Sequence, residues 1–376
     1  MGSLSRHISN RNISWDTAAK RAGLSTERLH DVDNGAAATL AEMRKIAGAL
    51  KLPVSSLLVE PDEADERIKI LFRRELRAED SNGEAYIHVA SNQIRETLTL
   101  AEGLPNNTWW LSAFDGAQAD LASAEGLANK FRSEVAGLND LDSFDELPRF
   151  LTEKLGVFLL YCKDPLIDGA SAIVNGYAFI LLGPRTFMPR VFFTLAHELG
   201  HIVAHHDRRV SGYAFFDKEG QADGTREHSR EDEKFADSFA SCLLLPRHGV
   251  ARALKVIRQQ IMATGPLGDY EINALARLYG VSFEVAGRRC EQLGFLGRNA
   301  ARALYQQLVH EHGNPERRAD ETGLPPRPEF HIRPSRNLLR HAVKKIRAGS
   351  LSVGKAAEIL NVSIQSLYEV NAETSV

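Results

Sequence analysis

The sequence predicts a mostly helical α+β protein with a helical bundle first, a central domain with a small sheet, and a short helical unit last. Three observations support this fold class. Short helical patterns with capping residues fill residues 1–60. Two apolar runs of strand length, 157–161 and 177–182, stand between turn-forming residues. Two long helical patterns, over 190–206 and 231–246, then follow. With 376 residues and a hydrophobic content of 43%, the chain is long enough for two or three domains.

Composition excludes several classes of protein. The net charge of −3 is near balance, so the chain as a whole is neither a polycation that coats nucleic acid nor an acidic tail protein. Cys162, Cys242 and Cys290 are widely spaced, which argues for a reducing compartment and against a disulfide framework or a cysteine-type zinc finger. The N-terminus lacks an apolar signal core, and no run of about 18 apolar residues occurs. We expect a soluble, cytoplasmic protein without membrane contact.

Residues 1–60 form the first predicted domain. Three short helices are expected behind N-capping residues: Trp15–Ala22 after Ser14, a second that Ser25 caps and that runs through Val32, and a third from Thr39 through Leu50. Glycine-containing turns, Gly23-Leu24-Ser25 and Asp33-Asn34-Gly35, separate these helices. In this order the segment resembles the Xre/phage-repressor type of DNA-binding domain, a helix-turn-helix bundle. The resemblance implies contact with double-stranded DNA.

The same domain departs from that family where DNA contact is usual. Trp15 stands where glutamine is common, and Ala36-Ala37-Ala38 lacks the customary basic residue. Residues 1–60 hold eight Lys/Arg against six Asp/Glu, a small excess for a DNA-binding face. The candidate phosphate contacts are Arg11, Lys20, Arg21, Arg28 and Arg44. The alternative is a protein-recognition or dimerisation module built on the same bundle.

The next segment changes in character at about residue 145. Residues 62–144 are charged and helical in pattern, which predicts a helical connector. A short amphipathic helix over 150–156 then precedes the two apolar runs, from which we expect a small sheet. Gly183-Pro184 ends the second run, and a helix over 190–206 follows.

That helix carries the sequence His197-Glu198-Leu199-Gly200-His201. Residues four apart lie on one face of a helix, so His197 and His201 can bind the same Zn²⁺. Glu198 is turned away from this pair by about 100°, yet it stays close enough to take a proton from a metal-bound water. The pattern therefore indicates a metal-dependent hydrolase with Glu198 as the general base.

Catalytic zinc needs at least three protein ligands, and the third is sought on the helix predicted over 231–246. Glu233 and Asp237 lie one turn apart on it, so we expect Glu233 to bind the metal and Asp237 to accept the second ring N–H of a ligating histidine. H-E-x-x-H followed by E-x-x-x-D is the thermolysin-type arrangement of a zincin-like domain. The alternatives for the third ligand are Asp207, ten residues after His197, and other acids including Glu231.

The chain contains L-A-H-E-L-G-H at 195–201 and E-(x)₂-A-D-(x)-F-A-(x)₂-L-L-L-P at 233–246. L-A-(x)₃-G-V-S at 275–282 and R-(x)₄-L-G at 288–294 follow in order. With these motifs the chain resembles the ImmA/IrrE metallopeptidases over residues 145–297. Asp237 stands where asparagine is more usual, a change that keeps the hydrogen-bond acceptor. The resemblance implies a zinc endopeptidase that cleaves a partner transcriptional repressor or antitoxin encoded nearby.

Other parts of the chain carry weaker signals. Candidates for stabilising an oxyanion are Tyr213, His228 and His248, and the long segment 207–230 is either a substrate gate or a connector. Residues 298–334 are polar and proline-rich, which predicts a linker. Residues 335–376 show a helix-turn-helix order, so we expect a small C-terminal helical unit. Its basic stretch over 340–347 fits either phosphate contact or a solvated helix face.

Two other functions fit the same residues. The first is a non-catalytic Xre-type transcription regulator or antitoxin whose metal site is structural or sensory. A purely structural site has no use for Glu198, which argues against this alternative. The second is a metal-dependent hydrolase that acts on a bond other than the peptide bond.

Overall fold

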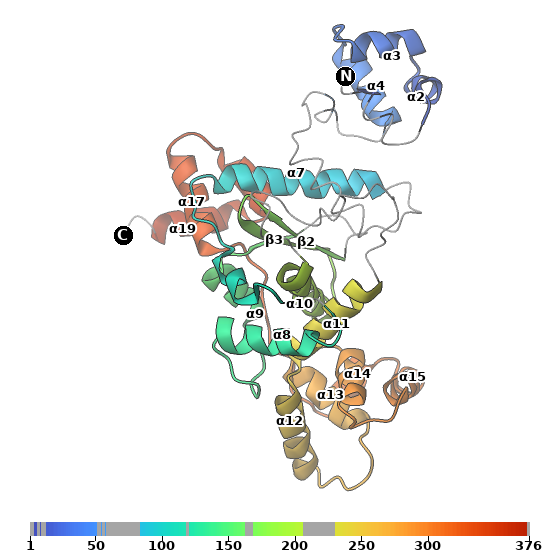
Figure 1. Cartoon of the computed structure of the whole chain (residues 1–376), viewed down its shortest axis with the longest axis vertical. Helices are drawn as coiled ribbons and strands as arrows, with labels where there is room; N and C mark the ends of the chain where they lie inside the picture. The colour runs from blue at the N-terminus through green and yellow to red at the C-terminus, as the bar shows by residue number, and fades with distance from the viewer. Residues whose placement is uncertain are drawn as a thin grey trace. The chain divides into compact units, whose positions relative to one another are not determined.

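Figure 1 shows the computed structural model of the chain, which describes residues 4–5, 8, 13–50, 54, 57, 83–117, 120–161, 168–205 and 230–373. The chain divides into two compact units, Met1–Asn92 and Gln93–Val376. Helices dominate the described residues, and three strands form one sheet. The expected α+β class with a small sheet is therefore confirmed.

The N-terminal unit contains three consecutive short helices, α2 (Trp15–Ala22), α3 (Thr26–Asp33) and α4 (Leu40–Ala49). Each begins at the predicted cap, because the side chains of Ser14, Ser25 and Thr39 accept hydrogen bonds from the backbone N–H three residues further on. Leu29 and Ile46 are buried together with the alanines of α2 and form the core of the unit. The three helices match the predicted ranges to within one or two residues.

The second unit is built around the sheet and two long helices. The elements before the sheet are α7 (Gly83–Ala101), which begins in the first unit, η1 (Trp109–Phe114), α8 (Ala124–Lys130), η2 (Phe131–Val135), α9 (Leu147–Arg149) and η3 (Phe150–Lys154). The sheet and the long helices are β1 (Phe158–Tyr161), β2 (Gly169–Val174), β3 (Tyr177–Leu182), α10 (Met188–His205) and α11 (Arg230–Leu244). The helices that follow are α12 (Arg247–Gln260), α13 (Asp269–Leu278), α14 (Phe283–Gln292), α15 (Ala300–His312), α16 (Pro315–Glu321), α17 (Arg336–Arg347), α18 (Val353–Leu360) and α19 (Ile364–Glu373).

The sheet has the strand order β1-β3-β2, with β1 parallel and β2 antiparallel to β3. The sequence predicts β1 and β3, but it does not predict β2, whose residues Gly-Ala-Ser-Ala have little tendency to form strands. β2 and β3 join through a two-residue turn, Asn175-Gly176, in which both residues have positive φ values of 52° and 77°. An Asn-Gly pair is a strong hairpin signal, so the turn is the feature of the sequence that could have revealed β2.

The two long helices pack against each other beside the sheet (Figure 1). Phe192 and Leu195 of α10 and Phe235 and Phe239 of α11 are fully buried between them and the rest of the core. Gly200 sets how closely these helices approach, because a Cβ at this position would lie 3.3 Å from Cα of Ala236 and 3.1 Å from Cδ1 of Phe239. The absence of a side chain at Gly200 therefore lets the faces of α10 and α11 meet directly.

The expected connector over residues 62–144 is only partly a connector. Residues 93–144 belong to the second unit, and Trp110, Phe114 and Phe131 are buried in the same core as α10 and α11. Arg132, which is almost completely buried, donates a hydrogen bond of 2.8 Å to the carbonyl oxygen of Leu243 at the end of α11. The charged composition of the segment hides these contacts, because its few aromatic residues do the packing.

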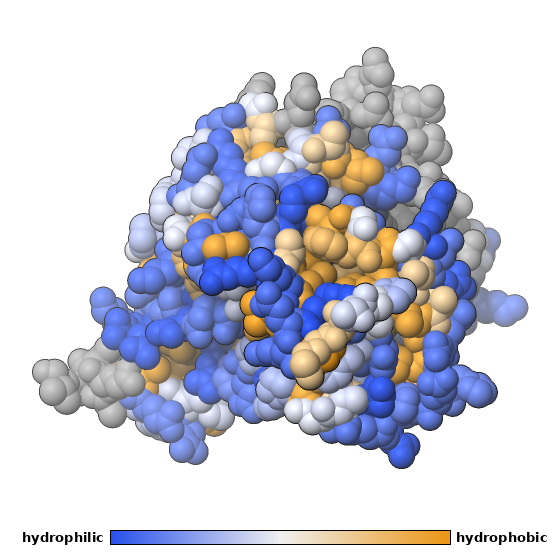
Figure 2. Space-filling model, turned by 90° about the horizontal axis from the view of Figure 1, so that it is seen from below, coloured by the Kyte–Doolittle hydropathy of each residue, from blue (hydrophilic) through white to orange (hydrophobic). Residues whose placement is uncertain are grey.

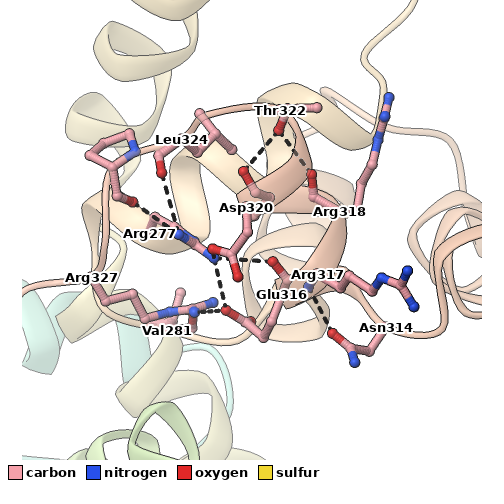
Figure 3. A network of polar contacts seen from close by, with 12 residues as sticks. Arg277, Val281, Asn314, Glu316, Arg317, Arg318, Asp320, Thr322, Leu324 and Arg327 are labelled. Atoms are coloured by element: carbon pink, nitrogen blue, oxygen red, sulfur yellow. Dashed lines mark hydrogen bonds and ion pairs between the residues drawn. The ribbon is translucent and has the colours of Figure 1, made fainter.

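We expected residues 298–334 to be a linker. They contain α15 and α16, followed by a stretch without helix or strand over residues 324–334, and Figure 3 shows the polar contacts of this region. The buried guanidinium of Arg277 on α13 lies 2.6 Å from a carboxylate oxygen of Asp320, and Glu316 makes ion pairs with both Arg277 and Arg327. Further along, the ring of Phe330 lies 4.5 Å from that of Phe192. Polar side chains hold this segment against the core, which composition alone does not reveal.

The surface of the second unit is mixed in character. Figure 2, seen from below, shows an apolar area in the middle of a mostly hydrophilic face. Large apolar side chains that are exposed on α12–α15 and their connections are Val256, Ile261, Met262, Leu278, Phe295 and Val309. Among the described helices, none combines the length and the apolar character that a membrane span requires.

Candidate metal centre

The metal-binding pattern lies on α10, near its C-terminal end. The Nε2 atoms of His197 and His201 are 3.0 Å apart, so both rings are directed at one point, as their four-residue spacing predicts. His201 is almost completely buried, whereas His197 keeps 16% of its side chain exposed. The site is therefore set in the core but opens on the side of His197.

Glu233, in the first turn of α11, completes the cluster. Its two carboxylate oxygens lie 3.3 Å from Nε2 of His197 and 3.5 Å from Nε2 of His201. In a tetrahedral zinc site with bonds of about 2.0–2.1 Å, neighbouring donor atoms are about 3.3–3.4 Å apart. The three observed separations of 3.0, 3.3 and 3.5 Å agree with this spacing, so His197, His201 and Glu233 fit one zinc ion. The structure thus brings together the three side chains that the sequence predicts as ligands, in a cluster that could hold a metal ion.

Asp237, one turn after Glu233, contacts the opposite side of the first imidazole. Its carboxylate oxygen lies 3.0 Å from Nδ1 of His197, the contact that the sequence predicts. Burial lowers the pKa of His197, but the hydrogen bonds to Asp237 and Glu233 outweigh burial and raise the pKa to about 10. The surrounding carboxylates thus favour positive charge at this ring, and a divalent cation bound here would supply that charge while the ring itself stayed neutral.

Glu198 lies between α10 and the sheet and is 3% exposed. Burial raises the pKa of its carboxyl group to about 7, although the charge of His197 and a hydrogen bond with Ser171 act in the opposite direction. Its Oε2 atom is buried and has no hydrogen-bond partner among the described residues. A buried carboxylate oxygen without a partner is rare in folded proteins and indicates a place for a ligand or a water molecule.

β2 supports Glu198 from the side of the sheet. A Cβ at Gly169 would lie 2.6 Å from Oε1 of Glu198 and 2.5 Å from Cγ2 of Thr194, so only glycine leaves room for both side chains. Asp168, the residue before Gly169, is 2.6 Å from the guanidinium of Arg190 at the start of α10. Gly169 and Ser171 are contributions to the site that the sequence did not predict, because β2 itself was missed.

The alternative third ligands and the candidates for stabilising an oxyanion lie in different parts of the chain. Asp207, Tyr213 and His228 lie outside the described residues, and Glu231 is exposed and not part of the cluster. His248 makes an ion pair with Asp140 beyond the C-terminal end of α11. Because Glu233 and Leu244 are eleven residues apart on this helix, the far end is about 16 Å from the metal-binding turn. His248 thus follows the end of α11 that is opposite to the metal-binding turn.

The basic residues suggested for DNA contact are also not equivalent. Lys20, Arg21 and Arg44 are exposed and make no ion pair among the described residues, and Arg11 lies outside those residues. Arg28 instead lies 2.9 Å from the carboxylate of Glu42 and donates to the carbonyl oxygen of Ala37. Arg28 thus holds α3 against α4 through its Nε and Nη2 donors.

The sheet, α10, α11 and the cluster fall within a segment that matches a metallopeptidase family model. Residues 152–291 match the profile of the Peptidase_M78 family, described as the IrrE N-terminal-like domain. The match begins inside η3, includes the sheet with α10 and α11, and ends within α14. It supports the resemblance to the ImmA/IrrE metallopeptidases over the central part of the chain. A comparison with curated proteins finds no match.

Proposed function

We propose that the protein is a zinc-dependent endopeptidase that cleaves a partner transcriptional repressor or antitoxin. The observation that carries this proposal is the combination of three metal ligands at zinc-like spacing with the buried, unpartnered Oε2 of Glu198 beside them. The family match supports the peptidase class, and the resemblance to ImmA/IrrE proteins supports a regulatory protein as the substrate.

His197, His201 and Glu233 hold the metal in this proposal. Zn²⁺, when bound, acts as a Lewis acid that polarises a substrate carbonyl and lowers the pKa of a coordinated water to near neutrality. Glu198 is the general base, and its carboxyl group, whose pKa is raised by burial, lies beside the ligands in position to accept and return a proton. Asp237 keeps Nδ1 of His197 protonated, so that Nε2 of the neutral ring is free to bind the metal.

The sheet supports a peptide as the substrate. β2 is an edge strand within the described sheet, and its residues Gly169 and Ser171 contact Glu198. Extended peptides bind to sheet edges through main-chain hydrogen bonds. The backbone of a peptide substrate that pairs with β2 would therefore lie beside Glu198, the general base.

The test compares metal-loaded wild-type protein with Glu198→Gln in the presence of the repressor-like proteins encoded beside it. We expect cleavage by the wild type and a loss of at least about 10²-fold in the variant, which keeps its zinc. Glu231→Gln is the matched control, because Glu231 is an exposed glutamate outside the cluster. Cleavage that survives Glu198→Gln would contradict the role of the base. Full zinc loading of Glu233→Ala would favour another third ligand, such as Asp207.

We also propose that the N-terminal unit binds double-stranded DNA through Lys20, Arg21 and Arg44. Their exposure and lack of ion pairs support this role. Phosphate contacts make affinity depend on salt, so the triple alanine variant should bind DNA more weakly and with a shallower salt dependence than the wild type. Equal binding by both proteins would instead favour a protein-recognition module.

A further inference from the structure

A second concave site lies in the Gln93–Val376 unit, and none of the metal ligands lines it. The pocket has a volume of about 510 Å³. Its walls are α17, the loop over residues 104–109, the end of η3 and the start of β1. This volume falls within the range of about 300–1,000 Å³ that is usual for small-molecule sites.

The walls of this pocket are strongly cationic. Lys154, Arg340, Lys344 and Arg347 line it against a single carboxylate, that of Glu153. One oxygen of Glu153 already accepts a hydrogen bond of 2.8 Å from the backbone N–H of Arg336. Residues 335–376, which include α17, also carry a net positive charge. They contain six Lys/Arg and three Asp/Glu, a net charge of +3 in a chain whose total net charge is −3. The pocket thus concentrates positive charge that the rest of the chain does not share.

Two other cations of the C-terminal helices already hold these helices in place. Lys345 donates to the carbonyl oxygen of Thr99 at 2.7 Å, and Lys355 lies 2.7 Å from the carboxylate of Glu96. In contrast, no hydrogen bond or ion pair is made within the described part of the chain by the side chains of Lys154, Arg340 and Lys344. Arg340 and Lys344 are one helical turn apart and line the same pocket, so their charges can act on a single anionic group.

An exposed indole completes the pocket. Trp109 lines it with 66% of its surface exposed, whereas the adjacent Trp110 is buried and donates its ring N–H to the carbonyl oxygen of Asn107. Asn107 also accepts a hydrogen bond of 2.6 Å from the backbone N–H of Ala178 in β3. The loop that carries Trp109 is therefore anchored to the sheet. A fixed, exposed aromatic face is a platform on which a planar ring can stack.

We propose that this pocket binds a nucleoside di- or triphosphate. Arg340 and Lys344 hold the phosphates, and Trp109 stacks on the base. The concave shape and limited volume favour a free nucleotide over a nucleic-acid duplex, which requires a broad surface. This inference is independent of the peptidase activity.

The test titrates the full-length protein with ATP or GTP in the presence of Mg²⁺, followed by calorimetry and by tryptophan fluorescence. We expect saturable binding of one nucleotide per chain, with a change in fluorescence that is absent in Trp109→Leu. The variant Arg340→Ala/Lys344→Ala should bind at least tenfold more weakly, and Trp109→Leu about tenfold more weakly. Arg317→Ala is the matched control, because this exposed arginine lies on α16 and does not line the pocket. Melting temperatures establish that each variant is folded.

Three results would overturn the inference. The first is absence of binding at millimolar nucleotide, or equal affinity in all folded variants. The second is binding of inorganic tripolyphosphate as tight as that of ATP and unaffected by Trp109→Leu, which would leave an anion site without a base subsite. The third is binding of a single-stranded oligonucleotide but not of mononucleotides, which would indicate a nucleic-acid surface instead.

Discussion

Gly169→Ala tests whether β2 positions Glu198, the proposed general base. The new Cβ would lie 2.5 Å from Cγ2 of Thr194 and 2.6 Å from Oε1 of Glu198. Non-bonded carbon atoms require about 3.5–4.0 Å, so the strand or the Glu198 side chain must move by about 1 Å. A displacement of this size in a catalytic group costs about 10²-fold in rate, equivalent to about 2.7 kcal/mol in the activation barrier. Zinc binding should persist, because the three atoms nearest to the added methyl group belong to Thr194 and Glu198 and not to the proposed ligands.

The assay combines peptidase rate, zinc content and melting temperature for the same preparations. Overpacking costs about 1–3 kcal/mol, so we expect Gly169→Ala to melt several degrees lower than the wild type but to remain folded. Gly126→Ala on α8 is the matched control, because a Cβ there meets no atom within 4 Å. A folded, zinc-loaded Gly169→Ala protein that cleaves within about twofold of the wild-type rate would refute the role assigned to β2.

Three further predictions concern the packing and the charges of the chain. Asp237→Ala removes the carboxylate 3.0 Å from Nδ1 of His197 and should weaken zinc binding about 10–100-fold, measured in competition with a chelator. An unchanged zinc affinity would show that this contact does not orient the ring. Gly200→Ala should force α10 and α11 apart by a few tenths of an ångström and lower both the melting temperature and the zinc affinity. If the melting temperature and the zinc affinity both stayed unchanged, the two helices would adjust to the methyl group without cost. Hydrogen bonds from Arg28 and Thr39 lower the pKa of Glu42 from 4.5 to about 2, so its carboxylate stabilises the fold above pH 4.5 and this contribution disappears as the pH falls towards 2. Thermal melts of wild type and Glu42→Gln should therefore differ at pH 7 and converge near pH 2, and a constant difference would contradict this linkage.

Much of the metal centre follows from helical periodicity. His197 and His201 share a face because they are four residues apart, and the apolar pattern around Phe235 places Glu233 and Asp237 one turn apart on the next helix. The structure brings the two faces together with donor separations of 3.0–3.5 Å. Local spacing could single out these candidate ligands because they come from only two helices, although it does not bring the helices together.

Segments whose role depends on long-range packing were predicted less well. The charged region after residue 62 and the proline-rich region after residue 298 have the composition of connecting segments. Trp110 and Phe131 nevertheless pack in the core, and Arg277 holds Glu316 and Asp320 beside α13. A single aromatic or acidic residue in a polar segment carries no signal of its distant partner, so composition could not distinguish a docked segment from a free one.

The sequence by itself determined the candidate metal donors, the helices that present them and the caps that start the N-terminal helices, because each depends on residues that are close along the chain. Only the tertiary structure decided how the donors and the base are arranged in space. Gly200 permits the close approach of α10 and α11, and Gly169 lets β2 reach Glu198. Burial between these elements raises the pKa of the Glu198 carboxyl group to about 7. Such effects arise from atoms brought together by folding, and no local pattern encodes them.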